Sequence, residues 1–212
     1  MEARLTLAPE LASIVRPAVL WWAGAVVIEH EPRLDPLLRD AEYRVRANPP
    51  SESAEVRTMY KRVGIDPTKT RPSNEALLRR VRKGQSLPRV NALVDIVNWC
   101  SVEFQLPYGL YDLAQVRGAV TMRLGQPGEE YAGIRKDAVH VGGRITLVDD
   151  EGPFGNPTSD SARTMVTAAT TDALVVVYAP AGTEAGRLGH VLDTTASRIT
   201  GIAGGRETAR QL

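Results

Sequence analysis

The sequence predicts a mixed α/β domain, and three observations carry that prediction. Patterns typical of amphipathic helices dominate the first half of the chain, with recognisable N-cap and C-cap residues. From about Gly118 onward, β-branched segments separated by Gly and Pro turns replace them. A last helical pattern begins near Thr183, a good N-cap residue. Helices, then a run of strands, then a helix favour a mixed α/β (α+β) sandwich over a doubly wound sheet.

The first elements follow from apolar runs and the residues that end them. Residues 18–29 are rich in Val, Ile and Trp and predict a buried strand. A short helix is expected before the Pro49-Pro50 pair, which ends it. Another helix is expected over residues 51–63, because Gly64 behind it can adopt the left-handed conformation of a helix C-terminus.

The next two helices have clearer signals. Pro72 and Ser73 predict the start of one, and Lys83 and Gly84 predict its end. The stretch "NALVDIVNWCSV", residues 91–102, predicts a further helix that is apolar on most sides and therefore buried.

The second half of the chain holds the predicted strands. They are the segments "AVTMRL", "RITLVD" and "ALVVVYA". The final helix is expected to pack through one apolar face, formed by Leu188, Val191, Leu192 and Ile199.

The composition is that of an ordinary soluble globular protein. The chain has 212 residues, of which 43% are hydrophobic and 24% charged, enough for one sizeable domain or one domain with a lobe. A single cysteine, Cys100, excludes an internal disulfide framework and fits a reducing compartment. The longest apolar run, Pro17 to Ile28, is shorter than the roughly 20 residues that span a bilayer and poorly fits a signal peptide. We therefore expect a cytoplasmic protein without a membrane partner.

Basic residues gather in one part of an otherwise neutral chain. The net charge is +1, but residues 57–83 alone carry +7, which leaves −6 on the rest. Such a basic helical lobe has the electrostatic form of a surface that contacts a phosphate backbone. Two solvated helix faces remain an equally open interpretation. The nine basic residues are Arg57, Lys61, Arg62, Lys69, Arg71, Arg79, Arg80, Arg82 and Lys83.

Polar residues interrupt the predicted helix over residues 91–102. Asn91, Asp95 and Asn98 are four and three residues apart, so a helix places them on one face. Buried polar groups need partners. Those partners are either loop backbone groups or the polar groups of a ligand, and both interpretations remain open.

Two further segments are candidate pocket walls. In "LPYGLYD", Pro107 and Gly109 predict a turn next to Tyr108, which suits a pocket wall or a packed corner. In "GPFGNPTSDSART", turn formers precede a dense set of short polar side chains. Such a loop lines an anion or carbonyl site, or satisfies its own backbone through Asx and ST turns. The polar candidates in this loop are Asn156, Thr158, Ser159, Asp160 and Ser161.

Several sharper chemistries are disfavoured. His30, His140 and His190 lack metal-ligand spacing, so no metal site is expected. No glycine pattern matches a P-loop or a dinucleotide fingerprint, so no cofactor is expected. Ser159 and Ser161 have no nucleophile-elbow context. No catalytic residue is identified from the pattern of residues.

Three stretches together resemble a known module. They are "YKRVGIDPTKTRPSNEALLRRVRKG", "LPRVNALVDIVNWCSVEFQLPYGLYDL" and "GPFGNPTSDSART". Their order and spacing are similar to those of the B3/B4 domain, the editing module of the phenylalanyl-tRNA synthetase beta subunit. The resemblance covers about Tyr60 to Pro180 and implies a three-layer α/β sandwich. It implies a free-standing domain that binds tRNA or aminoacyl-tRNA, with hydrolysis of mischarged tRNA in trans as the candidate activity. It does not imply a complete tRNA ligase, because no class II catalytic motifs are evident.

The resemblance carries over unevenly to the individual site residues. Asp95 and Asn98 match the family's "VDITN"-like segment, whereas Val97 stands at its threonine. Gly109 stands where the synthetase has its pocket histidine, and about Val177 stands where it has its editing glutamate. Without these groups no general base is identified. Asp160 and Asp95 are the carboxylates left to consider.

These expectations combine into a proposed organisation of the chain. Residues 1–50 are expected to pack on a B3/B4-like domain at 51–203, and 204–212 to form a frayed tail. The ligand pocket is expected between the three polar segments, next to the basic lobe as a tRNA-binding surface. A non-enzymatic binder of an amino acid-like small molecule remains the alternative function.

Overall fold

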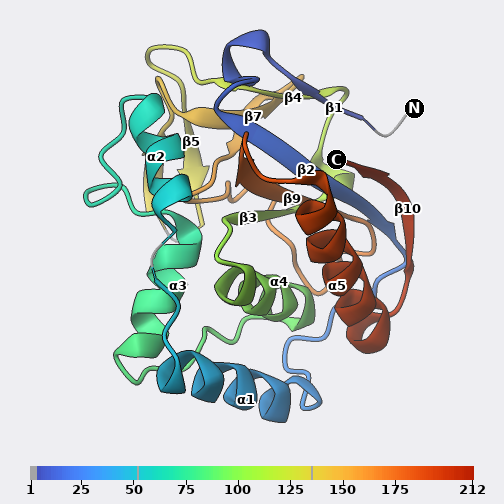
Figure 1. Cartoon of the computed structure of the whole chain (residues 1–212). Helices are drawn as coiled ribbons and strands as arrows, with labels where there is room; N and C mark the ends of the chain where they lie inside the picture. The colour runs from blue at the N-terminus through green and yellow to red at the C-terminus, as the bar shows by residue number, and fades with distance from the viewer. Residues whose placement is uncertain (1–3, 52, 135) are drawn as a thin grey trace.

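A central antiparallel sheet lies between a layer of helices and a second sheet in the computed structural model (Figure 1). The structure describes residues 4–51, 53–134 and 136–212. The central sheet has the strand order β10-β2-β9-β3, and the second sheet the order β1-β4-β7-β8. Strands β5 and β6 form a separate hairpin. The predicted mixed α/β sandwich is confirmed.

The helices are α1 (Leu34–Ala47), α2 (Ala54–Arg62), α3 (Ser73–Arg82), α4 (Ala92–Phe104) and α5 (Ala185–Ala203), with short 3-10 turns η1 (Pro9–Leu11) and η2 (Leu113–Gln115). The central strands are β2 (Val15–Ala23), β3 (Tyr108–Asp112), β9 (Ala173–Pro180) and β10 (Arg206–Gln211). The others are β1 (Leu5–Leu7), β4 (Val120–Leu124), β5 (Glu130–Gly133), β6 (Lys136–His140), β7 (Ile145–Asp149) and β8 (Gly152–Gly155).

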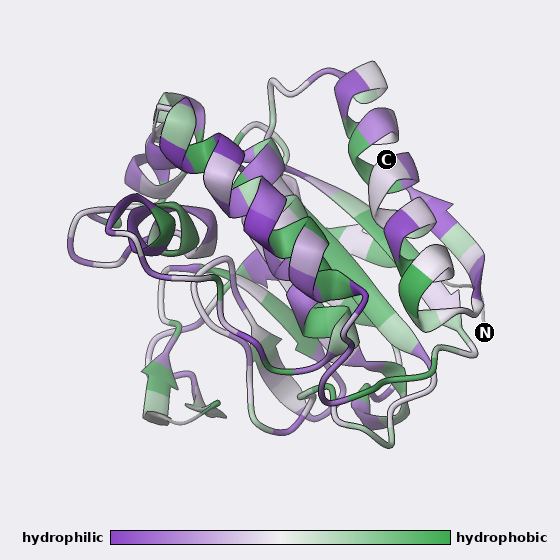
Figure 2. Cartoon of the chain, turned by 90° about the horizontal axis from the view of Figure 1, so that it is seen from below, coloured by the Kyte–Doolittle hydropathy of each residue, from purple (hydrophilic) through white to green (hydrophobic). Residues whose placement is uncertain are grey.

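The middle strands of the central sheet are apolar on both faces. β9 is buried from Ala173 to Ala179, because helices cover one face of the sheet and the second sheet covers the other. The rings of Tyr111 and Phe154 meet edge to face, with centroids 5.0 Å apart, and join the two sheets. Seen from below, the helices alternate hydrophilic and hydrophobic residues, whereas the strands behind them are mainly hydrophobic (Figure 2).

The helical layer follows the sequence closely. Gly64 and Gly84 have φ values of 76° and 77°, so both helix ends use the left-handed conformation expected of them. The apolar face predicted for the last helix is buried in α5. This helix begins at Ala185 after Glu184, so Thr183 is not its N-cap residue. No helix within the described parts of the chain is long and apolar enough to cross a membrane.

Two further sequence expectations are wrong. The "LPYGLYD" segment forms strand β3 rather than a turn, because each of its residues from Tyr108 to Asp112 pairs with β9. Residues 204–212 were expected to be frayed, but Arg206–Gln211 form β10 and pair with β2. The N-terminal segment contributes β2 to the same sheet, where it lies between β10 and β9.

Candidate functional site

A pocket of about 500 Å³ opens between α4, β3 and the loop after β8. We call it the Asp160 pocket. Val90, Ile134 and Met165 are among the chain's exposed large apolar residues, so an apolar lining reaches the surface here. The pocket is lined by Val90, Val94, Val97, Asn98, Tyr108, Leu110, Ile134, Asp160, Ala162, Met165 and Val166.

A second hollow of about 470 Å³ runs along α3, and we call it the α3 groove. Three of its lining side chains, Arg79, Arg80 and Lys83, are basic. Asn98 lines both hollows, so the basic groove and the apolar pocket meet at this residue. The α3 groove is lined by Ser73, Ala76, Leu77, Arg79, Arg80, Lys83, Gln85, Pro88, Asn98 and Thr158.

The polar residues predicted on α4 have different roles. The Asn91 side chain caps α4, where it accepts a 3.0 Å hydrogen bond from the Val94 backbone N–H. The Asp95 carboxylate is buried and accepts bonds from Arg89 Nε at 2.7 Å and from the Val90 backbone N–H at 2.8 Å. Both residues therefore shape the start of α4, whereas Asn98 reaches the pocket.

The loop after β8 satisfies most of its own polar groups. Asn156 Oδ1 accepts hydrogen bonds from the backbone N–H groups of Thr158 and Ser159, at 2.8 and 3.0 Å. Its Nδ2 donates to the Tyr131 hydroxyl at 2.8 Å. Gly155 and Asp160 face each other across an isolated antiparallel bridge, which closes the loop. The loop is thus a folded turn that supports Asp160.

The remaining hydroxyl groups of the loop also have partners. Thr158 Oγ1 lies 2.8 Å from the Tyr60 hydroxyl, which attaches the loop to α2. Ser161 Oγ lies 3.0 Å from Thr164 Oγ1. Ser159 uses its carbonyl oxygen, which accepts a 2.5 Å bond from Tyr131. Of the five polar residues predicted in this loop, only Asp160 lines the Asp160 pocket.

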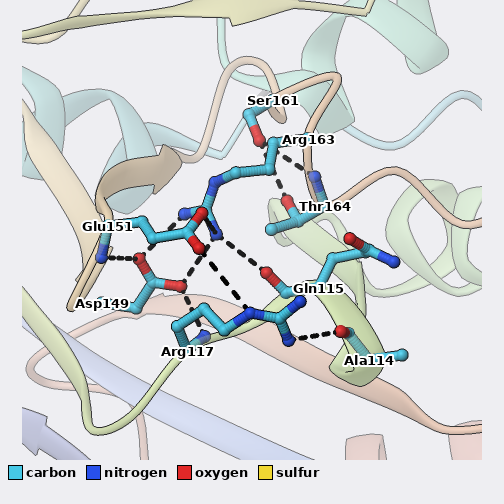
Figure 3. Close-up of polar contacts among 8 residues, drawn as sticks. All are labelled: Ala114, Gln115, Arg117, Asp149, Glu151, Ser161, Arg163 and Thr164. Atoms are coloured by element: carbon cyan, nitrogen blue, oxygen red, sulfur yellow. Dashed lines mark hydrogen bonds and ion pairs between the residues drawn. The ribbon is translucent and has the colours of Figure 1, made fainter.

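Arg163 anchors the end of the loop (Figure 3). Its guanidinium donates to both carboxylate oxygens of Asp149, at 2.8 and 3.0 Å, and to the Gln115 carbonyl at 2.8 Å. The Asp149 side chain is fully buried in this pair, and Glu151 Oε2 lies 3.3 Å from the same guanidinium. A bidentate pair of this kind fixes position as well as charge. This anchor was not predicted from the sequence.

Among the described residues, Asp160 is the one acidic residue that lines the Asp160 pocket. Its Oδ1 is buried and has no hydrogen-bond partner. Burial raises the pKa of the carboxyl to about 7, although the neighbouring Tyr111 hydroxyl and Leu110 backbone N–H counteract the rise. The Tyr111 hydroxyl in turn lies 2.8 Å from that of Tyr178. Asp160 therefore changes charge near neutral pH inside an apolar pocket.

Gly109 and Val177, which stand where the resemblance implies the histidine and the glutamate, do not line the Asp160 pocket. A Cβ atom on Gly109 would lie 2.1 Å from the Tyr111 hydroxyl, so the Tyr111 ring leaves no room for a side chain there. Val177 is fully buried in β9, where it pairs with Tyr108. Pro107 is buried, and its carbonyl accepts the Tyr178 N–H. The Tyr108 hydroxyl points away to Thr195, at 3.1 Å.

The nine predicted basic residues separate into three groups of three. Arg79, Arg80 and Lys83 line the α3 groove. Arg57 pairs with the buried Glu75 at 2.8 Å, and Arg62 and Arg82 donate to the carbonyls of Ser13 and Pro50. Lys61, Lys69 and Arg71 do not line the groove.

Other chemistries find no support in the described residues. No group of three or more His, Cys, Asp or Glu side chains within 4–51, 53–134 and 136–212 is arranged to hold a metal ion. Cys100 is buried, which raises the pKa of its thiol. Asp160 and Asn98, which line the same pocket, are the chemically distinctive residues of the site.

Comparisons with known proteins agree with this architecture. Residues 55–204 match the model of the B3/4 domain. The phenylalanine–tRNA ligase beta subunit of Ralstonia nicotianae is 37% identical over 62 residues, which is 29% of this chain and 8% of that protein. The corresponding subunit of Paramagnetospirillum magneticum is 31% identical over 90 residues, 36% of this chain and 11% of that protein. The match thus spans about a tenth of the length of these curated relatives.

A solved structure shows the same fold. It is an N-terminal fragment of the phenylalanyl-tRNA synthetase beta subunit from Pyrococcus horikoshii, with a TM-score of 0.53 and 13% sequence identity. The superposition covers 98% of this chain and 50% of that one. With most of the chain matched by one family model and the fold shared with a synthetase fragment, the protein belongs to the B3/4 domain family.

Proposed function

We propose that this protein binds the aminoacyl end of a tRNA across the two hollows and hydrolyses mischarged aminoacyl-tRNA in trans. The observation that carries the proposal is Asn98, which lines both the basic α3 groove and the Asp160 pocket. A ligand that enters both hollows carries phosphate at one end and a small, largely apolar group at the other. The relatives' names, which denote a tRNA ligase subunit, support tRNA as that ligand.

The α3 groove suits the phosphate backbone of the tRNA acceptor end. Arg79, Arg80 and Lys83 lie within one turn of each other near the end of α3. Several basic side chains on one groove attract phosphates and release counterions, so binding of this kind weakens steeply with salt.

Asn98 is the candidate group for the hydrolytic step. Its carboxamide lies at the junction, where the ester between amino acid and ribose would lie. An amide N–H aimed at the ester carbonyl stabilises the charge that develops on this oxygen when water attacks. No Ser, Cys or Lys lines the Asp160 pocket among the described residues, so direct attack by water is favoured over an acyl-enzyme.

The proposal is tested with tRNAs charged with different amino acids. We expect salt-sensitive binding and faster ester hydrolysis for at least one of them. The triple variant Arg79→Ala, Arg80→Ala, Lys83→Ala should weaken binding and reduce the salt slope by about 3. Lys61→Ala, Lys69→Ala provides a matched control, because both lysines are exposed and lie outside the groove. If no charged tRNA binds or is hydrolysed, the proposal is wrong.

The alternative function is binding of a free amino acid-like molecule, which the Asp160 pocket by itself supports. A specific ligand raises the melting temperature by mass action. Thermal shift in the presence of amino acids, without any tRNA binding, would favour this alternative.

A further inference from the structure

The carboxylate of Asp160 is an unusual group in the lining of an apolar pocket. Seven of the pocket's lining residues are Val, Leu, Ile or Met. Within this lining Oδ1 is shut off from solvent and accepts no hydrogen bond. A buried acceptor without a partner costs free energy, and a buried charge costs more. The fold nevertheless holds Asp160 in this position, because the Gly155–Asp160 bridge and the Arg163–Asp149 pair fix the loop.

Among the residues that the structure describes, no cation relieves this cost. The titratable groups that face Asp160 are three buried tyrosines: Tyr111 of β3, Tyr178 of β9 and Tyr131 of β5. Burial raises the pKa of each phenol, so all three are neutral at physiological pH. The positive charge of Arg144 lowers the pKa of Tyr131, against the effect of burial. No Lys or Arg lines the Asp160 pocket among the described residues. The described residues thus leave the complementary positive charge to a ligand.

The rest of the pocket selects what accompanies that charge. The Tyr108 hydroxyl is already engaged by Thr195, and Asn98 lies at the opening shared with the groove. With Asn98 assigned to the ester, a polar side chain of the ligand would find no further polar side chain free to pair with it among the described lining residues. An aliphatic or phenyl side chain would instead remove apolar surface from water, which favours binding.

We propose that Asp160 binds the α-ammonium group of an amino acid ester with an apolar side chain, whose ester lies at Asn98. This inference rests on the proposed function and specifies its substrate class. The ammonium donates to the Asp160 carboxylate, the side chain occupies the valine-lined part of the pocket, and the esterified end leaves toward the α3 groove. The ligand is thus read at three points: a positive charge, an apolar body and a phosphate tail.

Small charge-matched amides test the inference without tRNA. L-leucinamide carries the ammonium, and isocaproamide is the same molecule without it. We expect L-leucinamide to bind at least tenfold more tightly by calorimetry. Asp160→Asn should remove this difference while leaving isocaproamide binding unchanged, and Asp150→Asn, an exposed aspartate outside the pocket, should keep it. Asp160→Glu serves as a second variant, and circular dichroism checks that each variant is folded.

Two outcomes would overturn the inference. Equal affinity for the two amides would show that Asp160 does not bind an ammonium. Preference for L-tyrosinamide over L-phenylalaninamide, lost in Asp160→Asn, would assign Asp160 to a ligand hydroxyl instead. Binding of tRNA is measured separately: amine recognition without tRNA binding refutes the proposed function alone. If tRNA binding is salt-sensitive but L-leucinamide and isocaproamide bind with equal affinity, only this inference is refuted.

Discussion

The hydroxyl groups of Tyr111 and Tyr178 lie 2.8 Å apart in the interior of the domain, next to Asp160. Two glycines make this arrangement possible. A Cβ atom on Gly109 or Gly155 would lie 2.1 or 2.2 Å from the Tyr111 hydroxyl. The Tyr111 ring of the same strand therefore occupies the space that a side chain at position 109 would need, and the histidine that the resemblance implies there would collide with it.

Restoring the family's histidine should damage this protein. We expect Gly109→His, and even Gly109→Ala, to lower the free energy of unfolding by about 2 kcal/mol or more, because overpacking forces the Tyr111 ring to move. Urea unfolding measures the change. Gly189→Ala is the matched control: it lies in α5 with open space around it, so alanine should be neutral or slightly stabilising. Unchanged stability in Gly109→His would contradict the steric explanation.

The charge of Asp160 should make the folded protein less stable at high pH. Burial raises its pKa to about 7, so the folded state holds a proton that the unfolded chain releases near pH 4. Stability is then lost as pH rises from about 4 to 7. Asp160→Asn should therefore match the parent near pH 4 and exceed its free energy of unfolding by on the order of 2 kcal/mol at pH 8. A difference independent of pH would show that Asp160 is solvated.

Ligand binding should depend on the same proton. The affinity for L-leucinamide should rise as pH increases to about 7, since the carboxylate form of Asp160 binds the ammonium. It should fall again above roughly pH 8, where an α-amino group loses its proton. Binding at pH 6 should release a proton to the buffer, which calorimetry in buffers of different ionisation enthalpy detects. Isocaproamide provides the control, and its affinity should stay flat.

Asn98 should matter for activity more than for stability. It is half-buried at the junction of the two hollows. Asn98→Ala should slow hydrolysis of a charged tRNA by roughly 100-fold if its amide stabilises the oxyanion. The melting temperature should change little, and tRNA binding should remain salt-sensitive. An equal loss in binding and hydrolysis would instead assign Asn98 to ground-state contacts.

The anchor of the loop offers a test of rigidity. Arg163→Ala leaves the buried Asp149 carboxylate without its bidentate partner, and we expect a loss of about 2 kcal/mol in unfolding free energy. Ligand affinity should fall as well, because Asp160 is only three residues away. A double-mutant cycle with Asp149→Asn measures the pair itself. If affinity is unaffected, the loop is held by its other contacts.

The helices were predictable because their signals are local. Gly64 and Gly84 end α2 and α3, and the apolar face of α5 follows from the spacing of four residues. β10 was missed because "RETARQ" is almost entirely polar and lacks the apolar alternation of a typical strand. Its residues alternate between exposed and half-buried at a sheet edge, and only pairing with β2 orders it. β3 was missed for a different reason: Pro and Gly are common in turns, so Pro107 and Gly109 favoured a turn over a strand.

The site was only partly predictable. Asn98 and Asp160 were identified as candidate site residues. Asn91 and Asp95 are residues of the same two types on the same helical face, but Asn91 is a helix cap and Asp95 is an ion-pair partner. Nothing local distinguishes these roles. The apolar lining was missed because Ile134 comes from the β5–β6 hairpin, which only tertiary structure brings to α4.

The last strand also has a topological consequence. The Gln211 carboxamide donates to the Leu5 carbonyl at 2.8 Å and accepts from the Leu5 N–H at 3.0 Å. The beginning of β1 and the end of β10 therefore lie side by side (Figure 1). A short linker between these two points would close the chain into a ring. The ring could then be reopened at a surface turn, giving a circular permutant with the same sheets and a new pair of ends.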